Sequence, residues 1–366
     1  MDRSHCRAFS RTTAAVVSLL AWTAAVSSSA QDAAAVDEDR ALGPEPAAEL
    51  APGNEAVSEA FRYEAHWQAK VDADLIDEAI DIATSWVNAA TVQYGDDSAE
   101  AFVPTLRLAE THYINDDPAK SVAAYLDAIK VGERNFGAVS PLLVKPLQRL
   151  GQIYQQQDDD EAAISALMRA KDITHRNAGI FNIEQGPIVD LLTESFWSMG
   201  DIRQATREQR FLFGTAEKTY GDDNPNLVPA LHKWARHNAR IGRLSDSRQI
   251  YHRALEVMEN TYGPNDLRLI DTLYRMANTL VPAGAGGQDN QYYPREGAIA
   301  LSRAIDIYQA QEFVDNEDVL TAQARLGDWY MRNDRRNRAL DTYQSAIDQA
   351  RASGIDEASI DRQFGA

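Results

Sequence analysis

Basic side chains recur at a fixed spacing along this chain of 366 residues. Arg107, Arg149, Lys233 and Arg275 lie 42 residues, or a multiple of 42, apart, and Leu191 takes the position between the second and the third. Guanidinium and ammonium groups attract carboxylates, and arginine binds them through paired hydrogen bonds. The chain has 55 Asp and Glu against 36 Lys and Arg, so the row is basic within an acidic chain. It predicts a binding site for an acidic peptide or a free C-terminal carboxylate.

Other side chains near this row could contribute to the same site. The segment ALHKWARHNARIGR, residues 230–243, contains no acidic residue. The candidate partner-binding residues are Arg107, Arg149, Lys233, Arg236, Arg240, Arg275, Arg325, Trp197, Tyr274 and Asn278. Trp197 is the strongest single candidate, because large aromatic side chains dominate interface energies when a partner buries them. The alternative is that each basic residue pairs with an Asp or Glu of its own chain, and the sequence leaves both interpretations open.

Motifs of enzymatic chemistry are absent from the sequence. It contains no G-x-S-x-G, no P-loop and no H-E-x-x-H. His232 and His237 are five residues apart, which does not place them on one helix face as a metal pair. The acidic run at 155–163 lacks the alternating ligands of a calcium loop. We therefore expect no enzyme, no cofactor and no metal site.

A second recurring feature explains the spacing of the basic row. A glycine follows each of the residues Tyr94, Phe136, Ala178, Tyr220 and Tyr262, which are 42 residues apart. Each glycine ends a segment of helical hydrophobic periodicity, where a left-handed cap residue is expected. Polar residues and prolines that favour helix starts follow it. A period between about 20 and 50 residues indicates a repeat array, so the phrase marks the turn between helical hairpins.

The interior of each repeat carries a large residue followed by a small one. The large residues are Leu108, Leu150, Leu192, Trp234 and Met276, and the small ones are Ala109, Gly151, Thr193, Ala235 and Ala277. A sixth repeat fits when eight residues are inserted within 282–294. Such pairs suit closely packed antiparallel helices, so we expect them in the core. Pro104 and Pro146 predict helices that start late or bend, and Gln209 replaces an aromatic residue, which predicts loose packing of the third repeat.

This pattern resembles the tetratricopeptide repeat (TPR), most clearly at 242–263 and 326–347, and its 42-residue period is similar to that of kinesin light chains. The resemblance implies an all-α fold, a right-handed superhelical solenoid of antiparallel helix pairs. It also implies that the first helix of each repeat lines a concave groove, where the basic row would act like the carboxylate clamp of chaperone-binding members. The paired asparagines of light chains are absent, so recognition of their kind of cargo is not implied.

The ends of the chain have a different composition. Residues 1–30 combine three arginines, an apolar run of 15 residues and the small residues Ser28 and Ala30, which predicts a secretory signal peptide. An uncleaved anchor is the alternative, although spanning a bilayer takes about 20 apolar residues. Residues 31–57 predict a disordered acidic tether, 58–93 a degenerate first repeat, 94–352 six TPR-like repeats and 353–366 a C-terminal tail.

These features predict an exported protein. The only cysteine, Cys6, lies in the predicted signal peptide, and there is no Asn-x-Ser/Thr sequon. We expect the periplasm of a Gram-negative bacterium, with secretion as the alternative and no membrane insertion after cleavage. The formal net charge of −19 argues against nucleic acid as a partner. The predicted function is a scaffold that binds a protein or peptide in its groove. The alternative is a structural subunit of a cell-envelope complex that self-associates or is held by fixed partners.

Overall fold

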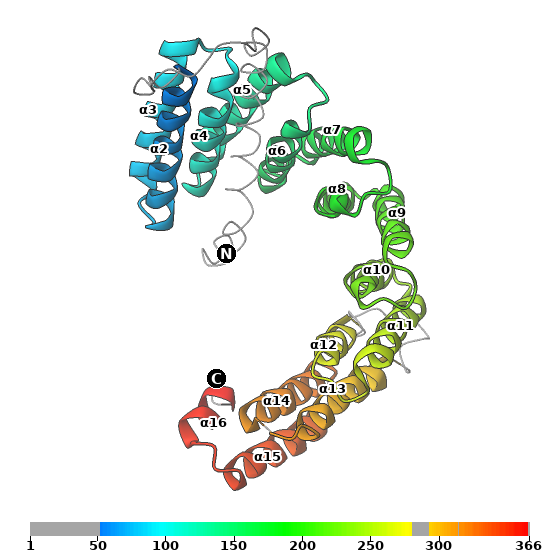
Figure 1. Cartoon of the computed structure of the whole chain (residues 1–366). Coiled ribbons are helices and arrows are strands. Elements are labelled where there is room, and N and C mark those ends of the chain that lie inside the picture. The colour runs from blue at the N-terminus through cyan, green and yellow to red at the C-terminus, as the bar shows by residue number, and fades with distance from the viewer. Residues whose placement is uncertain (1–51, 280–292, 314, 365–366) are drawn as a thin grey trace, which may run out of the picture. The chain divides into compact units, whose positions relative to one another are not determined.

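A computed structural model describes residues 52–279, 293–313 and 315–364 (Figure 1), and this part of the chain is helical and contains no strand. It divides into two compact units, at Met199 and Gly200. The first contains α2 (Pro52–Asp72), α3 (Ile76–Tyr94), α4 (Phe102–Ile114), α5 (Pro118–Phe136), α6 (Val144–Gln156), α7 (Asp160–Ala178) and α8 (Gly186–Ser198). The second contains α9 (Ile202–Tyr220), α10 (Val228–Arg240), α11 (Leu244–Tyr262), α12 (Leu269–Thr279), α13 (Tyr293–Gln309), α14 (Asn316–Arg332), α15 (Arg336–Ala352) and α16 (Glu357–Phe364).

Helices that follow one another in the sequence pack as pairs. In the first unit these pairs are α2 with α3, α4 with α5, and α6 with α7. In the second unit they are α10 with α11, α12 with α13, and α14 with α15. The prediction of an all-α fold built from helix pairs is therefore confirmed, and the superhelical course of the whole array stays a prediction.

The five recurring glycines end α3, α5, α7, α9 and α11, as predicted. Their φ angles lie between 80° and 95°, but their ψ angles lie between 153° and 172°. The expected left-handed helical conformation, with ψ near 47°, is therefore wrong. Positive φ combined with extended ψ is a region that essentially only glycine adopts, whereas Asn and Asp tolerate the left-handed helical one. The turn thus requires glycine more strictly than the expected conformation would.

A second positive-φ position, which the sequence reasoning missed, lies between the two helices of a pair. Asp74, Asp116, Asp158, Gly200 and Gly242 are 42 residues apart and have φ between 58° and 81°. Aspartate and glycine are both residues that enter this region at low cost. The change from aspartate in the first three repeats to glycine in the next two hides the period, although the spacing is as regular as that of the first set.

The small positions are buried as predicted, as are the large residues Leu150, Leu192 and Met276, whereas Leu108 and Trp234 are half-buried. Ala109, Ala235 and Ala277 are fully buried. A Cβ atom added to Gly151 would lie 2.5 Å from Cγ of Leu167, which is itself fully buried, so the second helix approaches the first too closely for alanine. Gln209, at the predicted weak point of the third repeat, is 7% exposed and contacts other residues.

The helix starts explain the two unusual prolines. Pro104 and Pro146 are the third residues of α4 and α6, and a turn of 3₁₀ helix precedes each of these helices, at Ala99–Ala101 and Pro141–Leu143. The prediction of a late start is therefore confirmed. A proline has no N–H to donate, and the first turn of a helix has no intrahelical acceptor for that group, so the ring costs little there.

Contacts between successive second helices join the repeats. Arg253 pairs with Glu217 at 2.7 Å and Arg303 with Glu259 at 2.6 Å, at equivalent positions one repeat apart. Side-chain amides add bonds to the glycine turn of the preceding repeat. Asn135 donates to the carbonyl of Asp97 at 2.8 Å, and the equivalent residues Asn177 and Gln311 donate to Val139 and Asn265. These bonds hold one turn against the next helix pair.

The predicted ends differ from the structure in two places. Helix α2 begins at Pro52, so residues 52–57 are helical and not part of a disordered tether. Proline favours a helix start, because its φ is already helical. The predicted C-terminal tail contains α16, whose Ile360 packs against Leu320 and Ala346. The predicted signal peptide and the rest of the tether lie outside the described residues, as does most of the insertion.

Replacing Gly221 with alanine should destabilise the second unit. A Cβ atom at Gly221 would contact nothing, so the cost is the backbone strain of positive φ, about 1–3 kcal/mol. The matched control is Gly214→Ala inside α9, where a Cβ atom also meets nothing and φ is not positive, so stability should rise by about 0.5–1 kcal/mol. Urea unfolding followed by circular dichroism measures both, and equal midpoints would contradict this account.

Candidate functional site

The candidate residues fall into two groups, one in each unit. Arg107, Arg149 and Trp197 lie on α4, α6 and α8 of the first unit. Lys233, Arg236, Arg240, Tyr274, Arg275, Asn278 and Arg325 lie on α10, α12 and α14 of the second. Apart from α8, these helices are the first of the packed pairs described above, as the repeat pattern predicted. Each group is therefore described on its own.

Arg107 is not available to a partner. Its side chain is 6% exposed, and its guanidinium pairs with Glu64 of α2 at 2.5 Å and with Glu110 at 2.7 Å. It also lies over the ring of Trp67, 4.7 Å from the centroid. Although burial opposes the charge, the carboxylates of Glu110 and Glu64 raise the pKa of Arg107 above its ordinary value. At Arg107 the structure therefore supports the alternative interpretation, pairing within the chain, because α2 supplies Glu64, one of the two acids that neutralise it.

The other two candidates in the first unit are half-buried. Arg149 donates from Nη1 to Oε1 of Gln152 at 2.8 Å, and its guanidinium lies 4.9 Å from the centroid of Tyr113. It makes no ion pair with any residue that the structure describes. Trp197 is half-buried on α8 and already contacts other residues of the chain. The candidate residues of the first unit therefore form no exposed basic cluster.

The second unit does bring basic and aromatic side chains together. Lys233, Arg236 and Arg240 are three and four residues apart, which places them on one face of α10. Helix α12 packs against α10. The guanidinium of Arg325, on α14, lies over the ring of Tyr274, on α12, 4.7 Å from its centroid. This contact joins the α12 and α14 parts of the surface. We call the surface of Lys233, Arg236, Arg240, Tyr274, Arg275, Asn278 and Arg325 the basic surface.

The charges of the basic surface differ in how far they are neutralised. Arg275 pairs with Asp271 at 2.8 Å and is 51% exposed, and this supports the alternative interpretation at that position. Lys233 and Arg240 also have contacts within the chain. Arg236 and Arg325 are exposed, and neither makes an ion pair with a residue in the described ranges. Their guanidinium groups are the ones best placed to donate hydrogen bonds to a partner's carboxylate.

A largely buried histidine, His232, lies beside this surface. His232 Nε2 is 2.9 Å from Oγ1 of Thr272, and Nδ1 is 4.0 Å from the carboxylate of Asp271. Burial and the charge of Arg275 lower the pKa of His232 from 6.5 to about 4, although Asp271 opposes the shift. The imidazole is therefore neutral near neutral pH and adds no charge to the basic surface. Burial also raises the pKa of Tyr274, so this ring stays a neutral contact.

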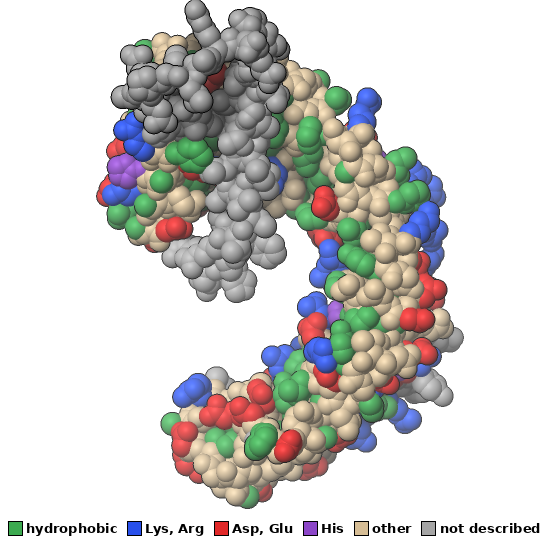
Figure 2. Space-filling view, in the orientation of Figure 1, with side chains coloured by type: hydrophobic (Ala, Val, Ile, Leu, Met, Phe, Trp, Pro, Cys, Tyr) green, Lys and Arg blue, Asp and Glu red, His purple; other side chains and the backbone are tan. Residues whose placement is uncertain are grey.

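The arrangement of exposed guanidinium groups beside an aromatic ring suits binding. Among the described residues, no cluster of three or more His, Cys, Asp and Glu side chains could hold a metal ion. In Figure 2, acidic and basic side chains are interspersed over much of the face shown. No helix in the described part of the chain has the length and apolar character needed to span a membrane.

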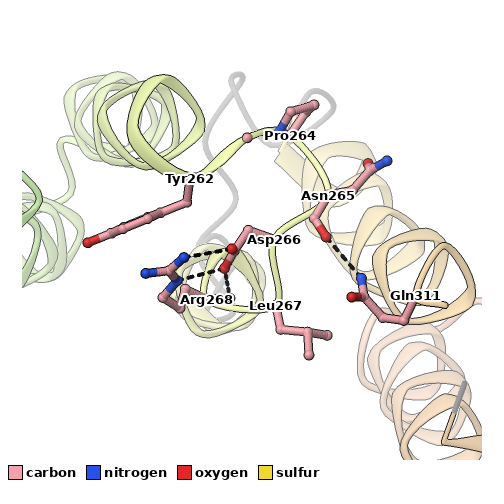
Figure 3. A pocket seen from close by; sticks show the side chains of 8 residues that line it. Tyr262, Pro264, Asn265, Asp266, Leu267, Arg268 and Gln311 are labelled. Carbon is pink, nitrogen blue, oxygen red and sulfur yellow. Dashed lines mark hydrogen bonds and ion pairs between the residues drawn. The ribbon is translucent and has the colours of Figure 1, made fainter. Parts of the chain in front are cut away.

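A pocket that the sequence reasoning missed lies at the turn between α11 and α12 (Figure 3). It measures about 500 Å³ and is lined by Tyr262, Gly263, Pro264, Asn265, Asp266, Leu267, Arg268 and Gln311. The guanidinium of Arg268 lies 3.4 Å from the centroid of the Tyr262 ring and donates two hydrogen bonds to Asp266. Those bonds lower the pKa of Asp266 to about 2. Since the charges neutralise each other, this pocket is part of the turn and a weaker candidate site.

Comparisons with known proteins support the repeat fold. A sequence model of the tetratricopeptide repeat family matches residues 97–174. The clustered mitochondria protein homolog of Aspergillus niger is 24% identical over 189 residues, which cover 51% of this chain and 14% of that protein. The homolog from Aspergillus clavatus is 23% identical over 204 residues, 55% of this chain and 15% of that protein. The chain thus spans only about a seventh of the length of these curated relatives.

A solved structure gives the same result for the fold. The TPR-like repeats of a Podosopora anserina protein named for kinesin light chain align with a TM-score of 0.50 and 13% identity. The alignment covers 56% of this chain and 97% of that one. It supports a TPR-like helical solenoid. The curated relatives named above are fungal, and the predicted bacterial origin and export stay predictions.

Arg107 and Arg325 occupy equivalent positions in their repeats, and their replacement by leucine should have unequal effects. Arg107→Leu leaves Glu64 and Glu110 without their buried partner and should lower the free energy of unfolding by about 3–5 kcal/mol. Arg325→Leu removes only an exposed contact with Tyr274, worth about 0.5–1 kcal/mol. Urea midpoints of the two variants test this. A loss of stability in Arg325→Leu as large as that in Arg107→Leu would show that Arg325 is structural too.

His232 should make the second unit sensitive to acid. The unfolded chain takes up a proton at His232 near pH 6.5, whereas the folded chain does so only near pH 4. Stability is therefore lost as the pH falls through this window, by up to about 3 kcal/mol. Between pH 7 and pH 4, the free energy of unfolding of His232→Gln should therefore fall by about 3 kcal/mol less than that of the native chain. If the urea midpoints of the native chain and of His232→Gln change in parallel with pH, the pKa of His232 is not lowered by folding.

Proposed function

We propose that this chain is an exported scaffold that binds an acidic segment of a protein partner on the basic surface of its second unit. The proposal rests mainly on one observation. Arg236 and Arg325, on α10 and α14, are exposed guanidinium groups without an acidic partner in the described part of the chain. They lie on first helices of the repeats, with the ring of Tyr274 beside Arg325.

The chemistry of the surface supports a carboxylate ligand. An exposed arginine forms two parallel hydrogen bonds with a carboxylate, and these bonds are stronger than those between neutral groups. Asn278 is exposed on the same helix as Tyr274 and could donate to the backbone of an extended peptide. Stacked helix pairs leave an extended surface for such a partner, which is the usual role of solenoid folds.

The proposed cellular location rests on the sequence alone. Residues 1–30 have the pattern of a signal peptide, and the chain from Gln31 onward contains no cysteine. We place the protein in a bacterial periplasm, or outside the cell. The structural-subunit role is the second candidate, since the equivalent basic residues Arg107 and Arg275 do pair within the chain. A subunit of that kind should self-associate when isolated, whereas a receptor should be monomeric.

Charge reversal on the basic surface should abolish partner capture. The chain serves as bait in an extract of the cell envelope, beside the variant Arg236→Glu/Arg325→Glu. The matched control is Arg335→Glu/Arg336→Glu, which changes two exposed arginines at the start of α15. Mass spectrometry identifies the retained proteins, and the N-terminal peptide of native protein recovered from the envelope shows whether the chain begins at Gln31.

We expect partners held by the native bait and the control, at decreasing yield as salt rises, and lost from the variant. Because the two arginines are exposed, the melting temperature should stay the same. Identical partners on all three baits would reject the basic surface as the binding site. Self-association of the native chain in light scattering, without any captured partner, would favour the structural subunit.

A further inference from the structure

Helix α9 carries a row of arginines that belongs to no site described above. Arg203, Arg207 and Arg210 are four and three residues apart, and all three are exposed. Residues at this spacing lie on one face of a helix, spread over about 10 Å along its axis. Figure 2 shows blue side chains gathered where α9 runs at the edge of the molecule.

Packing of the repeats does not require this row. The equivalent residues of α11 are Ser245, Gln249 and His252, and those of α15 are Asn337, Asp341 and Gln344. Positions that packing determines, such as the alanines of the core, recur from repeat to repeat. The three arginines occur in one second helix only, so their cause lies outside the solenoid.

The row is also without compensation inside the chain. None of the three arginines forms an ion pair within the described ranges. The two acidic residues of α9 are engaged elsewhere: Glu208 is 6% exposed, and Glu217 pairs with Arg253. Like charges four residues apart repel each other on a helix, and Arg203 lies in the first turn, where the helix dipole disfavours a positive charge. The folded chain therefore keeps these arginines at a cost to its own stability.

A glycine continues the same face. Gly214 follows Arg210 by four residues and lies in the interior of α9, where glycine is less stable than alanine. A Cβ atom there would meet nothing within 4 Å, so the fold itself does not need the glycine. The equivalent residues of α11, α13 and α15 are Glu256, Asp306 and Asp348. A glycine on an exposed helix face allows another backbone to come close.

We propose that this face of α9, formed by Arg203, Arg207, Arg210 and Gly214, docks an acidic helix of a partner protein. Carboxylates at positions i, i+4 and i+7 of such a helix match the spacing of the three guanidinium groups. The partner helix can pass close to the α9 backbone at Gly214. This surface is independent of the basic surface on α10, α12 and α14.

The row is too short for the alternative anions. Proteins that bind duplex DNA through its phosphates typically make about six to ten contacts, each releasing counterions, whereas this face offers three arginines. A membrane surface attracts clusters of about four to eight basic residues, usually beside an apolar anchor. Three guanidinium groups on one helix fit three carboxylates of a second helix, each through paired hydrogen bonds.

The test uses the full-length chain and a labelled alanine-based helical peptide with glutamates at i, i+4 and i+7. A second peptide of the same composition has its glutamates distributed around the helix. Fluorescence anisotropy gives their affinities for the native chain and for Arg203→Gln/Arg207→Gln/Arg210→Gln. The control variant Arg335→Gln/Arg336→Gln/Arg338→Gln removes the same charge from exposed positions at the start of α15. Gly214→Leu tests the close approach without changing the charge.

We expect the native chain and the α15 variant to prefer the matched peptide by at least tenfold. The α9 variant should lose that preference and melt at the same or a higher temperature than the native chain. Gly214→Leu should weaken binding severalfold with helicity retained. Equal affinity for both peptides, equal loss in both arginine variants, or tighter binding of duplex DNA or anionic vesicles would overturn the proposal. A lower melting temperature of the α9 variant would show that the row is structural.

Discussion

The glycine turn between repeats is the constraint on which the rest of the structure depends. At Gly95 and its four equivalents, φ is positive and ψ is extended. A Cβ atom at these positions would meet no neighbouring atom. The backbone conformation alone therefore disfavours any residue other than glycine. The chain therefore reverses at the same point of every repeat, and the amides of Asn135, Asn177 and Gln311 bind the turn of the preceding repeat. Fixed reversal keeps the first helices in register.

Register fixes where a side chain lies but not what surrounds it. Arg107 and Arg325 have equivalent positions, yet one is buried between two carboxylates and the other is exposed beside Tyr274. The difference comes from the preceding helix pair, because α2 places Glu64 and Trp67 against α4. A basic row that looks uniform in the sequence is thus neutralised at one end and available at the other.

The sequence was sufficient for features that recur and insufficient for those that do not. It predicted the glycine turns, the small residues of the core and the late helix starts at Pro104 and Pro146. It left open whether Arg107 pairs within the chain, because Glu64 is 43 residues away and its contact depends on tertiary packing. It also missed the α9 arginines, since a search by period selects residues that repeat. In a solenoid the recurring residues build the fold, so binding residues are best sought among the exceptions.

The net charge is a poor guide to such exceptions. A formal charge of −19 describes the whole chain, whereas at physiological ionic strength the field of an exposed charge is screened within about 8 Å. Arg203, Arg207 and Arg210 therefore act on a docked partner mainly through their own short-range field, as do Arg236 and Arg325. The acidic remainder of the surface repels large polyanions at longer range in low salt. Together these effects favour a partner with a few well-placed carboxylates over a uniformly charged polymer.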